Sequence, residues 1–204
     1  MSRPTLSIVI PTQGRNTLAR CLASIVVQAE AGDEILVVAD TREELQQDVG
    51  GLVAAFGLSS PARWRYLEHD GGRMSWGHDQ MERGLSAATA EWIVALDDDD
   101  IHLPGAYDAI RAAAVDHYGP MLFRFYAHYG VTIWTQVGDY TVGRIGGHCL
   151  VQPNVKDKLA PFPPAYTGDR DWIIGTVANW GGNDSVKWVD HVIAQCRPRV
   201  RRQA

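Results

Sequence analysis

The sequence lacks the features that mark secreted, membrane-spanning or disulfide-stabilised chains. Its three cysteines, Cys21, Cys149 and Cys196, lie far apart and without paired metal-ligand spacing, so we expect reduced thiols that pack in the interior. No apolar run approaches the roughly 20 residues that span a bilayer. Pro11 ends the N-terminal apolar stretch too early for a secretory signal. We therefore expect a cytoplasmic protein without a transmembrane segment.

Positive charge is also scarce. The formal net charge of −5 argues against an overall electrostatic attraction to nucleic acid. The exception is the C-terminal stretch "RPRVRRQA", whose arginines form either a solvated end or a contact to phosphate on a membrane or polymer. The remaining composition, 46% hydrophobic and 21% charged, is that of a globular chain, and we expect one domain over residues 1–204.

The first half of the chain alternates short β-branched runs with stretches of helical period. The expected strands cover residues 6–10, 34–39, 63–69 and 91–97. Thr41 stands three residues before Glu44, the spacing of a capping box, so we expect the second helix to begin there. This alternation predicts an α/β fold with a mainly parallel sheet and helices on both faces.

In such sheets, ligands bind beyond the carboxyl ends of the strands. The stretch from Pro11 to Arg15, the residue Asp40 and the run Asp97–Asp100 each come at or just after the end of an expected strand. Side chains from three separate segments are therefore expected to meet at one edge of the sheet.

The run Asp97–Asp100 comes directly after a buried strand. Adjacent carboxylates repel one another strongly in a poorly solvated place, so they need either open water or a multivalent cation. Carboxylate oxygens at a strand end suit Mg²⁺ or Mn²⁺ bound together with substrate phosphates. The alternative is a solvated loop whose last aspartate caps the next helix.

The pattern changes after Pro104. A helix over residues 105–118 is followed by strand-like runs punctuated by glycines, which we expect to form hairpins or mixed strands over the crevice of the first half. These runs cover residues 121–130, 131–138 and 140–145. A final helix over 171–180 and a strand over 186–195 complete the expected elements.

Three stretches together resemble one enzyme family. "LSIVIPTQGR", a second strand ending in Asp40, and "AATAEWIVALDDDDIHLPGA" look like the inverting glycosyltransferases of family two, which have the Rossmann-like GT-A fold. The resemblance implies a metal-dependent transfer of a sugar from a nucleotide diphosphate, with UDP-sugar as the expected donor, to an acceptor hydroxyl. It also implies a nucleotide-binding half, residues 1–103, and a mixed-strand acceptor half, residues 104–204.

The resemblance assigns most of the candidate site. Asp40 would accept a hydrogen bond from the base, Asp97 and Asp98 would lie near the ribose and donor sugar, and Asp99 would bind the Mn²⁺ or Mg²⁺ ion. Asp100 shares the metal role, because four identical residues leave the register of the Asp-x-Asp motif open. The expected donor-binding residues are Pro11, Thr12, Gln13, Arg15, Asp40, Arg73, His78, Asp97 and Asp98.

Arg73 and His78 enter this set through their own chemistry. An arginine binds phosphate in a bidentate manner, and a histidine donates one hydrogen bond. A local hydrogen bond in the loop is an equal alternative for His78. His191 would be a third metal ligand if the resemblance extends to the late histidine of some GT-A proteins, and otherwise a core residue.

The stretch "YTGDRDWIIG" supplies the expected catalytic base. Aligning it with the Glu-Asp motif of the family assigns the general base to Asp169, with Gly168 in place of the glutamate and Asp171 as the second choice. Acidic residues at the start of a helix are ordinarily N-caps or dipole partners, and that alternative applies to both aspartates.

Two other functions compete with a sugar transfer. A nucleotidyltransferase of related fold would want a glycine-rich, basic phosphate loop after the first strand, where the chain has only Arg15. A non-catalytic module would bind the nucleotide sugar and use the arginine-rich end to dock to a partner. The acceptor stays open among a glycan, a lipid-linked sugar, a protein side chain and a modified nucleobase.

Overall fold

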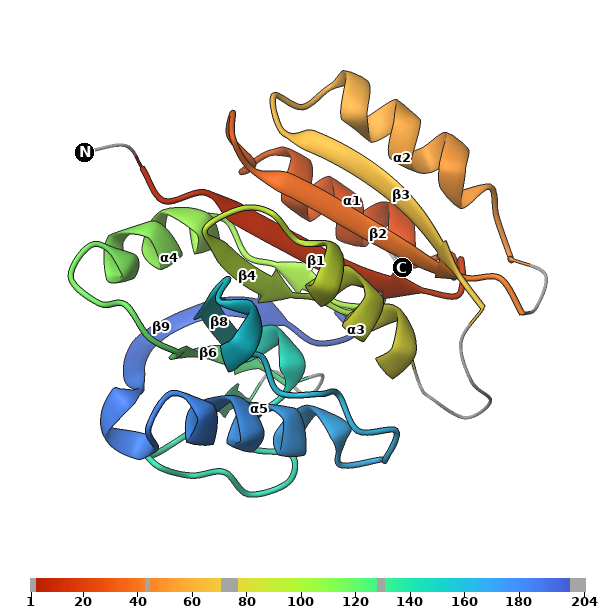
Figure 1. Ribbon diagram of the computed structural model, residues 1–204. Coiled ribbons are helices and arrows are strands. Elements are labelled where there is room, and N and C mark those ends of the chain that lie inside the picture. The colour runs from red at the N-terminus through yellow and green to blue at the C-terminus, as the bar shows by residue number, and fades with distance from the viewer. Residues whose placement is uncertain (1–2, 43–44, 71–76, 128–130, 199–204) are drawn as a thin grey trace, which may run out of the picture.

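The computed structural model describes residues 3–42, 45–70, 77–127 and 131–198 (Figure 1). The strands are β1 (Leu6–Thr12), β2 (Glu34–Asp40), β3 (Arg63–His69), β4 (Trp92–Ala95), β5 (Ile101–His102), β6 (Met121–Tyr126), β7 (Thr132–Ile133), β8 (Leu150–Pro153) and β9 (Lys187–Gln195). The α-helices are α1 (Leu18–Val26), α2 (Val49–Leu58), α3 (His78–Ala87), α4 (Ala106–Ala114) and α5 (Gly168–Asn179).

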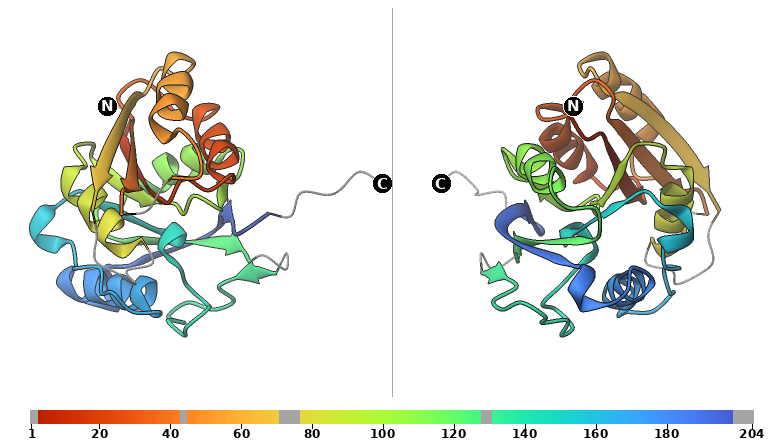
Figure 2. Two further views of the ribbon diagram at one scale, coloured as in Figure 1. Left: turned by 90° about the vertical axis from the view of Figure 1, so that its right-hand side faces the viewer. Right: turned by 60° about the vertical axis from the view of Figure 1, so that its left-hand side comes forward.

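One sheet joins both halves of the chain. Its strand order is β3-β2-β1-β4-β8-β6-β9-β5, with β7 beside β6. The first four strands are parallel, whereas β8 is antiparallel to both β4 and β6. The two ribbon views of Figure 2 show α1 and α2 on one face of the first strands and α3 on the other. The parallel first half and the mixed second half both agree with the sequence pattern.

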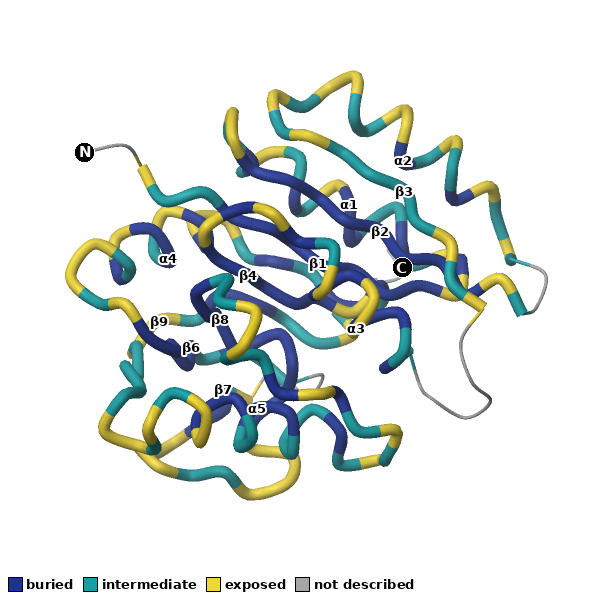
Figure 3. The backbone as a smooth tube through the Cα atoms, viewed as in Figure 1, coloured by how far each residue is buried: buried dark blue, intermediate teal, exposed yellow. Residues whose placement is uncertain are grey.

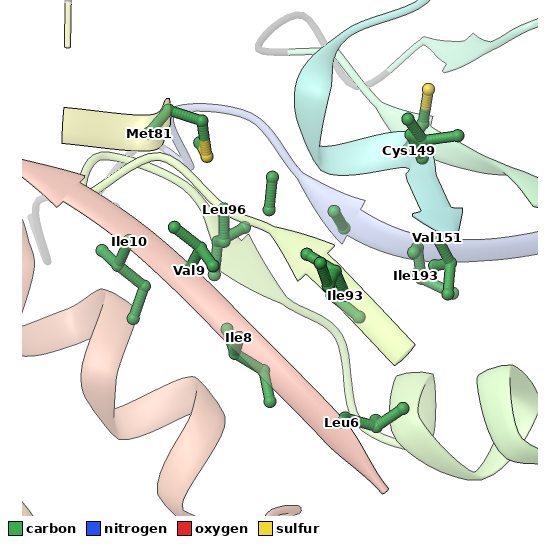
Figure 4. Close-up of a cluster of buried hydrophobic side chains, with 14 of the residues drawn as sticks. Leu6, Ile8, Val9, Ile10, Met81, Ile93, Leu96, Cys149, Val151 and Ile193 are labelled. Atoms are coloured by element: carbon green, nitrogen blue, oxygen red, sulfur yellow. The ribbon is translucent and has the colours of Figure 1, made fainter. Parts of the chain in front are cut away.

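The central strands are apolar on both faces, and this explains their position. Every residue of β1, β2 and β4 is buried, and the buried parts of the backbone run through the middle of the molecule in Figure 3. Figure 4 shows Leu6, Ile8 and Ile10 of β1 in the same cluster as Ile93 of β4 and Val151 of β8. Burying a side chain of this size stabilises the fold by roughly 1.5–3 kcal/mol.

Two helix boundaries differ from the sequence expectation. Helix α2 begins at Val49 rather than near Thr41, because Asp48 is its N-cap and accepts a hydrogen bond from the backbone N–H of Gly51 at 2.8 Å. Glu44 lies outside the described residues. Helix α5 begins at Gly168, so both candidate base residues lie within its first turn rather than before it.

The short strands also differ from the expectation. The strands β5 and β8 have two and four residues, too few to show a period in the sequence. Residues 140–145, expected as a strand, contain only an isolated bridge between Val142 and Ile145. Among the described helices, none is both long and apolar enough to cross a bilayer.

Candidate active site

A pocket of about 290 Å³ opens at the carboxyl ends of β1, β2 and β4. Both halves of the chain contribute to its walls. Ten of the residues predicted for the site line it: Pro11, Thr12, Gln13, Arg15, Asp40, His78, Asp97, Asp98, Asp99 and Asp169. The strand ends therefore converge as the sequence indicated, and the pocket is of the size that holds small ligands.

Asp98 is the most enclosed member of the aspartate run, with 1% of its surface exposed. Its carboxylate accepts a hydrogen bond from Thr12 Oγ1 at 2.6 Å and lies 3.3 Å from Arg15 Nε. Burial raises the pKa of Asp98, and the Thr12 hydroxyl and the Arg15 guanidinium oppose that rise. Thr12 thus holds Asp98 in place rather than pointing its hydroxyl at a ligand.

Asp99 is contacted by two cations. Arg15 Nη1 donates to its Oδ2 at 2.9 Å, and Arg197 Nε donates to the same oxygen at 3.0 Å. Arg15 follows β1 and Arg197 follows β9, so guanidinium groups from the two ends of the chain meet at one carboxylate. This arrangement offsets part of the repulsion within the run.

Asp100 and Asp97 have opposite environments. Asp100 accepts a hydrogen bond from the backbone N–H of Arg197 at 2.9 Å, and its other oxygen lies 3.3 Å from His148 Nδ1. Burial would raise the pKa of Asp100, but His148 and the Arg197 amide lower it overall. Asp97 is the most exposed of the four. Its pKa is nevertheless well above the usual range, because the pocket walls displace water from it and Asp169 adds negative charge.

The aspartate run fits a divalent cation. One carboxylate oxygen from each of Asp97, Asp99 and Asp100 lies within 4.8 Å of the others. Oxygen ligands of this kind suit Mg²⁺ and Mn²⁺. Asp97 is exposed, Asp99 is partly exposed and both line the pocket, so a cation can reach them from it, whereas Asp100 is buried behind them.

Asp40 lies at the far side of the pocket, at the end of β2, and is 5% exposed. Arg42 Nε donates to its Oδ1 at 2.8 Å, and the Arg42 backbone N–H donates to the same oxygen at 3.1 Å. The hydrogen bonds from Arg42 hold the pKa of Asp40 below its ordinary value. Asp40 is therefore an ionised acceptor, the state that a base N–H requires.

The structure separates the two candidates for the general base. Asp169 lines the pocket, and its Oδ2 accepts a hydrogen bond from the backbone N–H of Gly147 at 3.1 Å. Asp171 does not line it, and its carboxylate instead accepts hydrogen bonds from Thr167 Oγ1 at 2.7 Å and Arg170 Nη1 at 2.8 Å. Asp171 is therefore part of the helix start, the alternative that the sequence left open.

His78 explains why residue 168 is a glycine. A Cβ atom on Gly168 would lie 2.4 Å from His78 Cε1 and 2.7 Å from the Pro163 carbonyl oxygen. The His78 ring is 8% exposed and packs against Phe162, with the ring centroids 4.7 Å apart. Burial lowers the pKa of His78, so its ring is neutral at pH 7. The glutamate of the resembled motif has no room here.

Among the described residues, three predicted ones do not line the pocket: Asp100, Asp171 and His191. His191 lies on β9 where the register with β6 shifts between Val189 and Val192, and its side chain is exposed. It belongs to neither group of potential metal ligands found among the described residues. The structure thus does not support a ligand role for His191. Arg73 lies outside the described residues.

The sequence missed several residues of the pocket wall. These are Gly77, Gln80, Met81, Phe162, Ala165, Tyr166 and Arg197. Arg197 belongs to the arginine-rich end that the sequence left as a solvated tail or a phosphate contact. No local pattern in the sequence indicates its place, because it is the pairing of β5 with the end of β9 that brings Arg197 beside the aspartate run.

Known proteins resemble this chain in sequence and in fold. Residues 7–162 match the family described as Glycosyl transferase family 2. A comparison with curated proteins finds no match.

Among solved structures, S. aureus TarS has a similar fold, with a TM-score of 0.74 at 14% identity over 94% of this chain and 36% of that chain. TarS 1–349 in complex with UDP gives 0.72 at 15% identity over 94% of this chain and 60% of that chain. TarS 1–349 in complex with UDP-GlcNAc gives 0.71 at 15% identity, over 98% and 59%. The expected GT-A fold is confirmed, and the chain spans between 36% and 60% of these structures.

Proposed function

The chain belongs to glycosyl transferase family 2, and from this membership we propose that it moves a sugar from a UDP-sugar to an acceptor hydroxyl with inversion at the anomeric carbon. The UDP and UDP-GlcNAc complexes of the structurally similar TarS support the choice of donor. The single observation that carries the proposal is the position of Asp169, which faces Asp97–Asp99 across one pocket.

In this proposal, the nucleotide lies over the carboxyl ends of β1 and β2. Asp40 accepts the N–H of the base, because its carboxylate is ionised and lines the pocket. Arg15 and Arg197 lie beside Asp99, within the same wall, and offer guanidinium groups to the diphosphate. His78 lines the pocket on the side of Asp169 and shapes the space for the sugar.

Asp169 takes the proton of the acceptor hydroxyl. The acceptor oxygen then bonds to the anomeric carbon as the bond from that carbon to the diphosphate oxygen breaks, and attack from the opposite face inverts the configuration. The Gly147 backbone N–H fixes the orientation of the Asp169 carboxylate, which is what a base must have to meet a bound hydroxyl. Holding both substrates in one pocket supplies further acceleration.

Asp97, Asp99 and Asp100 are the residues that would hold the Mn²⁺ or Mg²⁺ ion, because their oxygens converge. A cation bound there offsets the negative charge that the leaving diphosphate acquires. The proposal also includes a single catalytic domain over residues 1–204 and a cytoplasmic location, in keeping with the three free cysteines.

Thermal unfolding tests donor binding. UDP or a UDP-sugar, added with Mn²⁺ or Mg²⁺ at about one hundred times its Kd, should raise the midpoint by roughly 5–10 °C. Asp40→Ala should weaken the shift for every uridine nucleotide. The exposed Asp157 supplies a matched control, since Asp157→Ala removes the same charge far from the pocket. A midpoint that no nucleotide changes, with or without metal, contradicts the proposal.

Turnover tests the base. With the donor that stabilises the protein and a panel of glycan, lipid-linked and peptide acceptors, Asp169→Asn should lower kcat by about 10²–10⁴-fold while leaving the UDP-dependent shift intact. Asp171→Asn is the control and should retain most of the activity. The anomeric configuration of the product, measured by NMR, checks inversion. Donor binding without turnover on any acceptor would instead favour a non-catalytic module.

A further inference from the structure

Three side chains of different chemistry meet beside the aspartate run, at the end of β9. They are Asp100, His148 and Cys196, and one ligand atom from each lies within 4.8 Å of the other two. Asp100 Oδ2 lies 3.3 Å from His148 Nδ1, and Cys196 Sγ lies 3.9 Å from the same nitrogen and 3.3 Å from Nε2. None of the three lines the pocket of the candidate active site.

The two spacings to His148 Nδ1 are close to the edges of a tetrahedral metal site. With Zn–S, Zn–N and Zn–O distances near 2.3, 2.1 and 2.0 Å, tetrahedral ligands stand about 3.3 Å apart for nitrogen and oxygen and about 3.6 Å for nitrogen and sulfur. The observed 3.3 Å and 3.9 Å to His148 Nδ1 are close to these values. A rotation of the Cys196 side chain that moves Sγ from Nε2 toward Nδ1 would complete the geometry.

The surroundings fix the ligands in place. Asp100 and His148 are 3% and 7% exposed, and the Arg197 backbone N–H holds Asp100 Oδ1 at 2.9 Å while leaving Oδ2 turned toward His148. The His148 ring packs edge-on against Phe125, with centroids 4.2 Å apart. Hydrogen bonds and packing of this kind orient the ligands of metal sites.

Two further details favour a bound metal ion. Gly146 leaves room for the imidazole, since a Cβ atom there would lie 2.7 Å from His148 Cε1. Cys196 is only partly buried, so an ion and a water ligand have a way in. A thiolate, an imidazole and one carboxylate form a mixed soft set that prefers zinc-like ions to Mg²⁺ or Ca²⁺.

We propose that Asp100, His148 and Cys196 bind a zinc-class transition-metal ion, distinct from the cation of the donor pocket. The ion replaces the thiol proton of Cys196 and any second proton on His148, and both protons go to solvent. Asp100 belongs to both groups, so the donor-pocket cation is left with Asp97 and Asp99 when this second site is filled. The proposal does not depend on the sugar transfer.

Cobalt reports on the thiolate directly. The full chain, reduced and freed of metal with a chelator that is then removed, is titrated with Co²⁺ alone. We expect a near-ultraviolet charge-transfer band from thiolate to cobalt that saturates at one ion per chain, and its loss on addition of one equivalent of Zn²⁺. Zn²⁺ alone should raise the thermal midpoint and release protons into a weakly buffered solution.

Matched variants distinguish the two metal groups. Cys196→Ser and His148→Ala should abolish the band, whereas Cys149→Ala removes the neighbouring thiol and should keep it. Asp99→Asn removes an oxygen ligand of the donor pocket and should also keep it, because that pocket contributes no sulfur. Each variant is first checked for a native circular-dichroism spectrum.

Two outcomes overturn the proposal. In the first, Co²⁺ binds without a thiolate band, which assigns all binding to the carboxylates. In the second, folded Cys196→Ser keeps the band or Cys149→Ala loses it, which assigns the sulfur elsewhere. Either result would leave the three side chains as a hydrogen-bonded cluster. Failure of donor binding in the thermal test above leaves the cobalt result unaffected, so the two proposals fail separately.

Discussion

Asp99 Oδ2 receives two guanidinium groups, and this makes Arg197 a competitor of a cation at the same carboxylate. The Arg197 side chain is 69% exposed, so solvent screens the pair and its contribution is at most about 1 kcal/mol. Arg197→Ala should therefore tighten the binding of Mn²⁺ alone by roughly two- to five-fold. Isothermal titration without nucleotide measures this change.

The matched control for that prediction is Arg83→Ala, which removes an exposed cation from helix α3 outside the pocket. Both variants change the net charge equally, so a general electrostatic effect would tighten binding in both. Equal affinities for Mn²⁺ in the Arg197→Ala variant and the wild-type protein would show that Arg197 does not compete for Asp99.

The protonation of Glu34 makes the stability of the protein depend on pH. Glu34 begins β2, at the other end of that strand from Asp40 and the pocket. Its carboxylate accepts a hydrogen bond from Ser7 Oγ at 2.6 Å and from the backbone N–H groups of Thr89 and Ala90. Burial alone would raise the pKa of Glu34, but these hydrogen bonds outweigh it and lower the pKa. A carboxyl with a lowered folded-state pKa stabilises the protein above its unfolded-state pKa, and that stability is lost as pH falls through the folded-state value.

We therefore expect urea-unfolding curves of the wild-type protein to show a loss of stability from about pH 5 downward. Glu34→Gln should be less stable at pH 7 by about 1–3 kcal/mol, because a neutral oxygen replaces the charged acceptor of three hydrogen bonds and the amide NH2 then faces Arg65 Nη1, which lies 3.4 Å from Glu34 Oε2. It should also show a smaller loss between pH 5 and pH 3. A variant with the same pH dependence as the wild-type protein would show that other carboxylates carry the effect.

Single site residues could be predicted from the sequence where they stand at the end of a strand. Thr12, Asp40 and Asp97–Asp99 follow buried strands, and the pocket brings them together. The cluster of Asp100, His148 and Cys196 was not predictable, because 48 residues separate the last two. From the sequence, Cys196 is expected to be a packing residue. His191, the expected late metal ligand, lies exposed at a shift in register.

Helix α3 lies closer to the sheet than a helix with ordinary side chains would. A Cβ atom on Gly84 would lie 2.2 Å from Val9 Cγ1 and 3.3 Å from Val38 Cγ2, so the missing side chain is what permits the contact. Gly84→Ala should destabilise the protein by about 1–2 kcal/mol, because overpacking outweighs the gain in helix propensity. Ser86→Ala, on the exposed side of the same helix, should be neutral or slightly stabilising.

Chemical denaturation of both variants measures the difference. The position of α3 also fixes His78 and Gln80 in the pocket wall, so Gly84→Ala should raise the KM for the donor as well. A folded Gly84→Ala variant with wild-type stability would show that the helix can move away from β1 at no cost.

Whole elements were predicted when they are long and periodic. The parallel strands β1, β2 and β3 and the helix carrying Met81 and Leu85 appear where the pattern put them. The start of α2 was missed because Thr41 and Glu44 have the spacing of a capping box, while Asp48 actually caps the helix. The strands β5 and β8 are too short for a period to be read, and only tertiary pairing creates them.

At the scale of the molecule, the pocket exists only because the sheet crosses from one half of the chain to the other. Strand β8 adds to β4, and this addition carries α5 and β9 over the carboxyl ends of the first strands. Asp40 and Asp169 thereby line one pocket although they lie far apart in the sequence. Alternation of strands and helices predicted the parallel half, but no local pattern encodes how the second half folds back.

This arrangement makes a prediction about how the donor stabilises the chain. In the proposed complex, UDP with Mn²⁺ would contact both halves, so it should slow amide hydrogen exchange in 11–15 and 40–42 and also in 162–169 and 196–198. Since exchange in a folded protein reports local opening, protection in all four segments means that the nucleotide closes the second half onto the first.

The distant segment 106–114, helix α4, serves as an internal reference and should change little. The Asp40→Ala variant under the same conditions should lose the protection together with its thermal shift. If wild-type protection stays confined to 11–15 and 40–42, the nucleotide is held by the first half alone, and the proposed contact of Arg197 with the diphosphate is wrong.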